Sequence, residues 1–231
     1  MKRYALAALA ALSIAIPSVS QATTINVTSY GFAMGSKDGV LTTPGPFNGT
    51  NAAFGQFVLN GVNVTTGNTP VTFYTYCIDL FNGLALPGLF NVQPLSSVVD
   101  ATKTLNVTKI LSNVTPTNAD QSAAVQLAIW EVLFDTNAVR NVSAASGQFY
   151  VTGGSSNPAA QTLANGYLAS LSTWSVPVGT SATVLYSQSN QSQVFLTPVP
   201  EAGTWIMMIA GFGVAGVSMR RRRSTAAPSL V

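Results

Sequence analysis

The chain has 231 residues, of which 7% are charged, and it contains no histidine and one cysteine. Its net charge of +3 comes from the two ends, because residues 23–199 hold only four basic and six acidic side chains. A slightly acidic domain without a basic stripe excludes nucleic-acid binding. The absence of imidazole removes the usual general base and a common zinc ligand, so we expect neither an enzyme nor a metal or cofactor site.

The first part of the chain has the three parts of a secretory signal. Two basic residues come first, an apolar run follows, and small residues around Ala22 provide a cleavage site. The alternative is an N-terminal membrane anchor, but the apolar run is short and is broken by Pro17. We therefore predict a signal peptide over residues 1–22, export through the inner membrane by the secretion machinery, and a mature chain that starts at Thr23.

Strands are predicted on both sides of the middle of the chain. Alternating polar and apolar residues predict a strand in TTINVTSYGF, residues 23–32, and a β-branched, aromatic run predicts one in VTFYTYCIDLF, residues 71–81. In AAFGQFVLNGVNVTT, the dipeptide Asn60-Gly61 predicts a hairpin with a type I′ turn. Residues 181–198 predict two further strands that pair with each other.

Three helices are predicted between these strands. Residues 95–114 place apolar side chains at roughly helical intervals, and residues 157–172 have Pro158 in their first turn. The strongest helix is NADQSAAVQLAIWEVLFDT, residues 118–136, which Asn118 or Asp120 can cap. Its apolar stripe consists of Ala123, Leu127, Trp130 and Phe134. Together the elements predict one β-rich α+β domain over residues 23–197, a sandwich or barrel with about three helices in its middle.

The end of the chain joins a short apolar helix to a cluster of basic residues. Residues 204–219 are almost wholly apolar but contain three glycines, and four arginines follow them. These charges favour the cytoplasmic side for this end of a transmembrane helix, so that the rest of the chain faces outward. The apolar span is shorter than the roughly 20 residues of a comfortable membrane crossing. A sorting signal that an enzyme reads and removes fits this pattern better than the alternative, an ordinary tail anchor.

This tail resembles the PEP-CTERM sorting signal. The resemblance covers residues 198–223, with Ala202 in place of the second proline of the family name. It implies recognition by an exosortase-type enzyme, found in Gram-negative bacteria that make extracellular polysaccharide. It also implies a transient stay in the inner membrane, a cytoplasmic tail at residues 224–231, and delivery to the cell surface or extracellular matrix. The residues that carry the resemblance are Pro200, Glu201, Trp205, Arg220, Arg221, Arg222 and Arg223.

Two residues inside the domain stand out chemically, Cys77 on a predicted strand and Gln126 on the strongest helix. Both lie in apolar, aromatic surroundings, and Gln126 is on the same helix face as Trp130. A lone thiol in an exported protein invites oxidation or unwanted pairing. If the strand packs against the helix, the sulfur and the carboxamide meet in a dry pocket. The alternative is a buried cysteine that acts as a small apolar residue, with Gln126 hydrogen-bonded to the backbone.

The pair and its order resemble the thioester domains of surface adhesins. In these domains a strand cysteine joins the glutamine of a helical Thr-Gln-x-Ala motif, often followed by an aromatic residue. Here Gln126-Leu127-Ala128 keeps the Gln-x-Ala, Trp130 supplies the aromatic residue, and Val125 replaces the threonine. The resemblance implies that the sulfur attacks the carboxamide, ammonia leaves, and a thioester remains that an amine on a target can open.

Several side chains could support this reaction. Asp79 and Glu131 could polarise a group or shuttle a proton. We expect water to be excluded by the aromatic side chains of Phe73, Tyr74, Tyr76 and Trp130.

Two functions follow from the sequence. The first is a non-enzymatic protein of the cell surface or biofilm matrix, sorted by an exosortase and held among exopolysaccharide by non-covalent contacts. The second is a covalent adhesin that uses a Cys77–Gln126 thioester to react with surface amines. The first needs only the sorting signal and a polar β surface, and the two are compatible.

Overall fold

The computed structural model describes residues 23–135, 140–143, 145, 147–153, 158–198, 209, 212 and 213. The predicted signal peptide at 1–22 and nearly all of the predicted sorting helix at 204–219 lie outside the described residues, as do Pro200, Glu201, Trp205 and the arginine cluster. Within the described part of the chain, no helix is long and apolar enough to cross a membrane.

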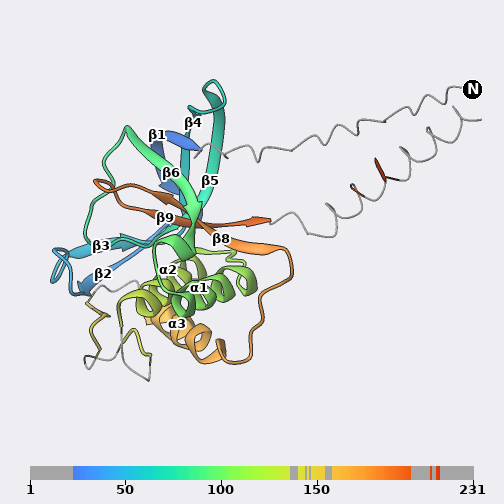
Figure 1. Ribbon diagram of the computed structural model, residues 1–231. Helices are drawn as coiled ribbons and strands as arrows, with labels where there is room; N and C mark the ends of the chain where they lie inside the picture. Colours follow the sequence, from blue (N-terminus) through green and yellow to red (C-terminus); the bar gives the residue numbers. More distant parts are fainter. Residues whose placement is uncertain are drawn as a thin grey trace, which may run out of the picture.

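Six antiparallel strands form a closed barrel (Figure 1). Its interior is filled by alternate side chains of the strands, such as Ile25, Leu59, Phe90 and Val184, all of which are fully buried. This architecture, with three helices in the middle of the chain, confirms the predicted β-rich α+β fold. Around the barrel the strands are β1 (Thr24–Phe32), β4 (Phe57–Asn63), β5 (Thr69–Cys77), β9 (Gln193–Pro198), β8 (Thr180–Tyr186) and β6 (Gly88–Pro94).

A second, three-stranded sheet lies beside the helices. It has the order β3 (Asn51–Phe54), β2 (Lys37–Thr42), β7 (Tyr150–Thr152). An ion pair of 2.9 Å between the Lys37 Nζ and the Asp120 Oδ1 links β2 to the first turn of the helix that follows Asn118. Leu41 and Phe54 bury their side chains in the same core as the barrel residues.

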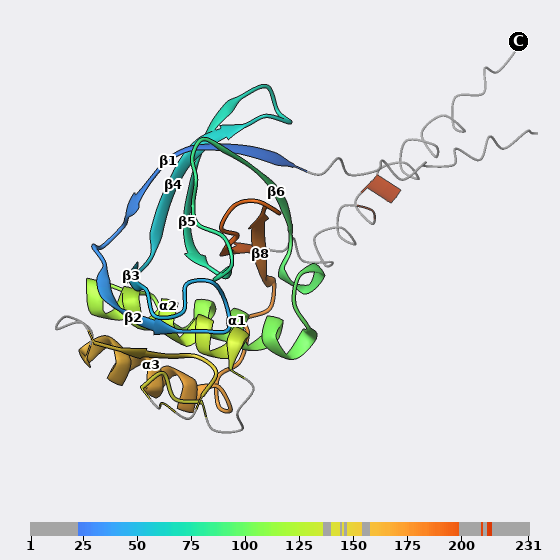
Figure 2. The same cartoon turned by 90° about the vertical axis from the view of Figure 1, so that its left-hand side faces the viewer.

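Three α-helices cover one end of the barrel in two layers, with α1 and α2 next to the barrel and α3 beyond them (Figure 2). Helix α1 (Ala101–Asn113) follows a short 3₁₀ turn at Leu95–Ser97, and α2 (Ala119–Phe134) and α3 (Pro158–Ser170) come later in the chain. Side-chain oxygens cap the first two helices: Asp100 accepts from the Lys103 N–H, and Asn118 accepts from the Gln121 N–H.

Helix α2 is buried on every side rather than on one apolar stripe. Every residue from Ser122 to Leu133 is buried, because the helix is enclosed by α1, α3 and the strands β2, β3 and β5. The predicted stripe residues Ala123, Leu127 and Trp130 are buried as expected, but so are the polar residues between them. Gln126 and Glu131 therefore lie in the protein interior, where each needs a partner.

The predicted hairpin turn at Asn60-Gly61 is wrong. Both residues lie within β4, and they pair with β1 on one side and β5 on the other. Gly61 serves a close approach instead of a turn, because a Cβ at this position would overlap the carbonyl of Asn26. The register of β1 shifts between Val27 and Ser29, directly beside this contact. A glycine in a strand can mark such an approach as readily as a turn.

Replacing Trp130 with alanine is expected to lower the free energy of unfolding by about 3 to 5 kcal/mol, the usual cost of deleting a buried large aromatic side chain. The indole is 3% exposed and makes edge-to-face contacts with Phe54 and Phe149 at centroid distances of 6.3 and 5.9 Å. Urea denaturation measures the loss. The control is Trp174→Ala, since Trp174 is only partly buried. A loss at Trp130 no larger than that at Trp174 would contradict this packing.

Candidate functional site

The site forms where the end of β5 meets the middle of α2. Strand β4 pairs with β5 as far as Thr75, and beyond that point the carboxamide of Gln126 binds the main chain of β5 instead. The Cys77 N–H donates to Gln126 Oε1 at 2.8 Å, and Gln126 Nε2 donates to the Cys77 carbonyl at 2.8 Å. The two residues that the sequence singled out are therefore in direct contact.

Both residues are completely buried, with exposed fractions of 0%. The Cys77 thiol donates to the Asp79 carbonyl at 2.9 Å and accepts from the Asp79 N–H at 3.3 Å. Burial raises the pKa of the Cys77 thiol far above its usual range, and the nearby Asp79 charge raises it further. The Asp79 main chain, the Trp130 indole and the Gln191 carboxamide lower this pKa, but their effect is smaller than that of burial. While the sulfur is unmodified, this raised pKa favours the protonated thiol.

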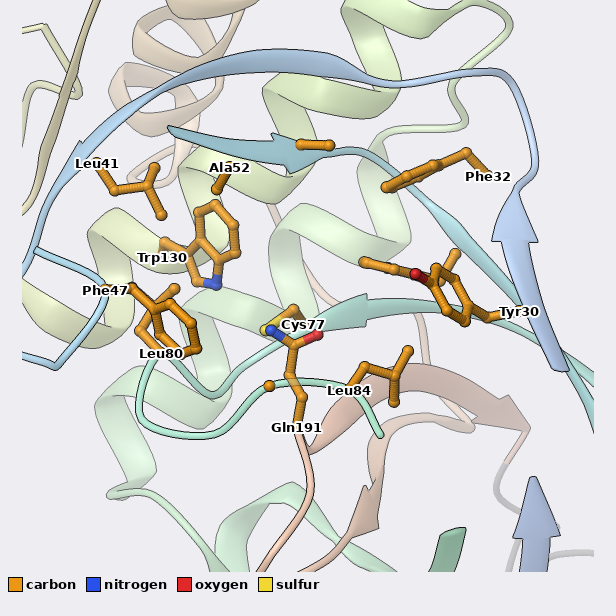
Figure 3. Close-up of a pocket in the computed structure, with 13 residues that line it drawn as sticks. Tyr30, Phe32, Leu41, Phe47, Ala52, Cys77, Leu80, Leu84, Trp130 and Gln191 are labelled. Atoms are coloured by element: carbon orange, nitrogen blue, oxygen red, sulfur yellow. The ribbon is translucent and has the colours of Figure 1, made fainter. Parts of the chain in front are cut away.

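A cavity of about 240 Å³ reaches Cys77 from the surface (Figure 3). Trp130 and Gln191 flank the sulfur, and the indole nitrogen is directed toward it. That indole N–H has no hydrogen-bond partner of ordinary geometry among the described residues. The lining consists of Tyr30, Phe32, Leu41, Phe47, Ala52, Ala53, Phe57, Cys77, Leu80, Gly83, Leu84, Trp130 and Gln191.

The loop after β5 holds the sulfur in place. The Asp79 carboxylate accepts from the N–H groups of Phe81 and Asn82 at 2.7 and 3.2 Å, and its second oxygen accepts from Asn82 Nδ2 at 2.8 Å. Gln191 Nε2 donates to the Asp79 carbonyl at 3.4 Å, which connects this loop to the segment just before β9. The Asp79 side chain thus shapes the loop, while its main chain contacts the sulfur.

Glu131 belongs to a different cluster, at the C-terminal end of α2. Its Oε1 accepts from the Asn141 N–H at 2.7 Å, and it does not line the cavity at Cys77. Burial raises the pKa of Glu131 to about 7; the Asn141 hydrogen bond opposes this shift, the Asp135 carboxylate adds to it, and Arg140 opposes it. The proton-shuttle role considered for Glu131 and Asp79 stays a prediction.

Of the four aromatic side chains expected to shield the site, only Trp130, on α2, lines the cavity at Cys77; the three on β5 do not. Tyr74 is 60% exposed, and with Tyr76 it borders a separate pocket next to Leu111 and Phe195. The cavity at Cys77 is walled instead by β1, by the small sheet and by the loop after β5. Sequence reasoning also missed Gln191, which lies in the polar run SQSNQSQV, where no periodic pattern marks one residue among its neighbours.

Within the described ranges, no three acidic or cysteine side chains gather closely enough to bind an ion. What the site brings together is a thiol, a primary carboxamide and a main-chain N–H already bonded to the carboxamide oxygen. These groups are suited to acyl transfer from the carboxamide to the sulfur.

Comparison with known proteins identifies the tail. Residues 198–223 match the PEP-CTERM protein-sorting motif. The C-terminal segment is a PEP-CTERM sorting signal. The chain is therefore an exported protein that an exosortase-type enzyme sorts from a membrane-anchored state, as the resemblance in the tail predicted.

For the exported domain the comparisons yield less. No curated protein matches the chain. Among solved structures, it is similar to the thioester domain of the Staphylococcus aureus TIE protein, at 12% sequence identity and a TM-score of 0.39, over 76% of this chain and 78% of that one.

The Glu131 pKa makes stability depend on pH. An unfolded chain loses this proton near pH 4.5, whereas the folded protein keeps it up to about pH 7. Between these values the folded state binds more protons, so the free energy of unfolding is expected to fall by roughly 2 to 3 kcal/mol as the pH rises. In Glu131→Gln, which keeps an acceptor for the Asn141 N–H, this loss should disappear. Urea titrations between pH 4 and 8 that gave parallel profiles for both proteins would contradict it.

Proposed function

We propose that the chain is a non-enzymatic surface or matrix protein of an exopolysaccharide-producing cell, which attaches covalently to its target through a Cys77–Gln126 thioester. The observation that carries the proposal is the contact of the buried Gln126 carboxamide with both main-chain groups of Cys77, the residue that also carries the thiol. The same hydrogen bonds belong to the alternative, in which Gln126 binds the backbone and no thioester forms, so the mass measurement below decides between the two. The sorting signal supplies the setting, because an exported protein delivered to the cell surface meets targets outside the cell.

Thioester formation needs only the two residues. The Cys77 sulfur attacks the Gln126 Cδ, the Cδ–Nε2 bond breaks, and the thiol proton leaves with the nitrogen as ammonia. The Cys77 N–H already donates to Oε1, so it can stabilise the negative charge that develops on this oxygen in the tetrahedral intermediate. Burial excludes the bulk water that would hydrolyse the product.

The thioester is then used once. A target amine attacks Cδ, the C–S bond breaks, and an amide between Gln126 and the target remains beside a free Cys77 thiol. A reaction that ends in a permanent bond gives attachment without turnover, which is consistent with a chain that lacks the usual catalytic imidazole.

Asn190, directly before Gln191, makes a similar pairing with a residue that has no thiol. Asn190 pairs with Ala85 as Gln126 pairs with Cys77: its Oδ1 accepts from the Ala85 N–H at 2.7 Å, and its Nδ2 donates to the Ala85 carbonyl at 2.8 Å. Such a pairing fastens a loop in either case. Only at Cys77 does the bound residue also carry a nucleophile, and we therefore propose the reaction for Gln126 and not for Asn190.

Intact mass spectrometry of the exported protein tests the thioester. The folded protein is expected to weigh one ammonia less than its sequence, and its Cys77 should resist alkylation even after denaturation. Adding methylamine should raise the mass by that amine and expose one alkylatable thiol. Both Cys77→Ala and Gln126→Ala should abolish the deficit.

The matched control is Gln148→Ala, since Gln148 is exposed and does not line the cavity at Cys77. It should keep the full deficit. A wild-type protein of unmodified mass, with a thiol that alkylates on denaturation without any amine, would leave Cys77 as a buried apolar residue and remove the covalent function.

Processing of the tail is tested separately. The protein recovered outside the cell is expected to lack the residues from about Trp205 onward, because we expect the exosortase-type enzyme to cleave near the motif that it recognises. Deleting Arg220 to Arg223 should trap the chain before release, since these charges orient the helix. Peptide mapping of secreted material checks both points, and secreted protein that still ends in the intact arginine cluster would contradict cleavage.

A further inference from the structure

The cavity that leads to Cys77 has an unusual lining for a site that would accept a cation. None of the described residues that line it is charged at neutral pH, and most of its wall is aliphatic or aromatic. Its volume of about 240 Å³ exceeds the roughly 150 Å³ of an engineered apolar cavity that binds benzene. The space therefore suits a chain of several carbon atoms.

Three aromatic rings form one side of this cavity. Phe57 packs against Phe32 and Tyr30 with centroid distances of 4.7 and 5.9 Å. Phe57 is buried, whereas Tyr30 is 53% exposed and so lies at the mouth. Figure 3 shows Tyr30 and Phe32 on one side of Cys77, with Leu41, Phe47 and Ala52 on the other.

We propose that this cavity selects the target by its stem, the carbon chain that carries the reacting amine. It admits a primary amine on an unbranched aliphatic stem. The stem passes the rings of Tyr30, Phe32 and Phe57, and the amine arrives at Cys77 uncharged. The inference rests on the proposed thioester and adds the class of amine that opens it. Hydroxyl-bearing stems, such as those of amino sugars, are disfavoured because the lining is mostly hydrocarbon, and the Trp130 N–H and the Gln191 carboxamide lie beside the sulfur, where the amine reacts.

The uncharged lining also determines where the protons go. An ammonium ion can rest at the exposed ring of Tyr30, because aromatic faces attract cations. Farther in, desolvation favours the neutral amine, which is the nucleophilic form. When this amine attacks the carbonyl carbon, a C–N bond forms, the C–S bond breaks, and one proton moves from the amine nitrogen to the Cys77 sulfur. Burial raises the pKa of this thiol, so the sulfur accepts that proton readily without another base.

The test compares amines of equal length. The protein is incubated with n-butylamine or with 3-aminopropan-1-ol, and adduct formation is followed by intact mass. Each rate constant is divided by that for a simple thioester in solution, which removes differences in basicity. The corrected rate constant for n-butylamine is expected to be at least about tenfold higher, since one methyl group in a fitting apolar pocket changes selectivity by about that much.

Two variants connect the selectivity to the cavity. Tyr30→Ala should bring the ratio closer to one, whereas Tyr74→Ala should not, since Tyr74 is a similarly exposed tyrosine that does not line this cavity. Leu84 is half-buried in the wall, and Leu84→Asp introduces a carboxylate there. In this variant the corrected rate constant for 1,4-diaminobutane, which carries a second charge, should rise relative to that for n-butylamine.

The outcomes separate this inference from the function on which it rests. A starting protein without the ammonia deficit would overturn the thioester itself. A protein with the deficit and with a corrected ratio near one would overturn the selection by stem and leave the thioester in place. A high ratio that Tyr30→Ala and Tyr74→Ala change equally would also overturn it, because the aromatic wall would then not be its source.

Discussion

The packing of the helices on the barrel depends on the hydrogen bonds of one buried carboxamide, that of Gln126. Helix α2 is enclosed on all sides, so a polar side chain in its middle must find partners inside the protein. Gln126 finds them in the main chain of Cys77, 49 residues earlier, at the point where β4 stops pairing with β5. This contact joins the barrel to the helices. It also places the only thiol of the chain beside the only fully buried carboxamide on α2.

Most of the helices and strands around this contact can be predicted from the sequence, because they follow from local residue patterns. The helix capped by Asn118 and the helix that begins at Pro158 occur where the sequence predicts them. The strand predicted over residues 71–81 occurs as β5 but ends at Cys77, and the residues after it form the loop that holds the sulfur. The sequence also predicts that Cys77 and Gln126 lie close together, since a polar residue in an apolar helix needs a buried partner. The hydrogen bonds, however, join the carboxamide to the main chain of Cys77, as in the alternative in which Gln126 binds the backbone. The turn predicted at Gly61 is wrong, because the sequence alone does not distinguish a glycine in a turn from one that faces a carbonyl, here that of Asn26.

The cavity could not be predicted in the same way. Its walls come from β1, the small sheet, the loop after β5 and Gln191, which meet only when the barrel closes. The two-residue period shows that Phe73 and Tyr74 lie on opposite sides of β5. It does not show whether either side faces the cavity at Cys77, and neither residue lines it. Glu131 is similar: its neighbour Trp130 reaches the cavity, yet its own side chain turns to the Asn141 N–H at the other side of α2.

Burial of the thiol also reconciles export with reactivity. The thiolate is the form that reacts with oxidants and disulfides, and a buried sulfur with a raised pKa stays protonated. The same burial would slow an ordinary nucleophile, so the Gln126 carbonyl has to be held against Cys77 in advance. Folding supplies that proximity, and it does so only after α2 and β5 have packed together. The proposed thioester would therefore form in the folded domain outside the cytoplasm, where loss of ammonia to the surrounding water makes the step hard to reverse.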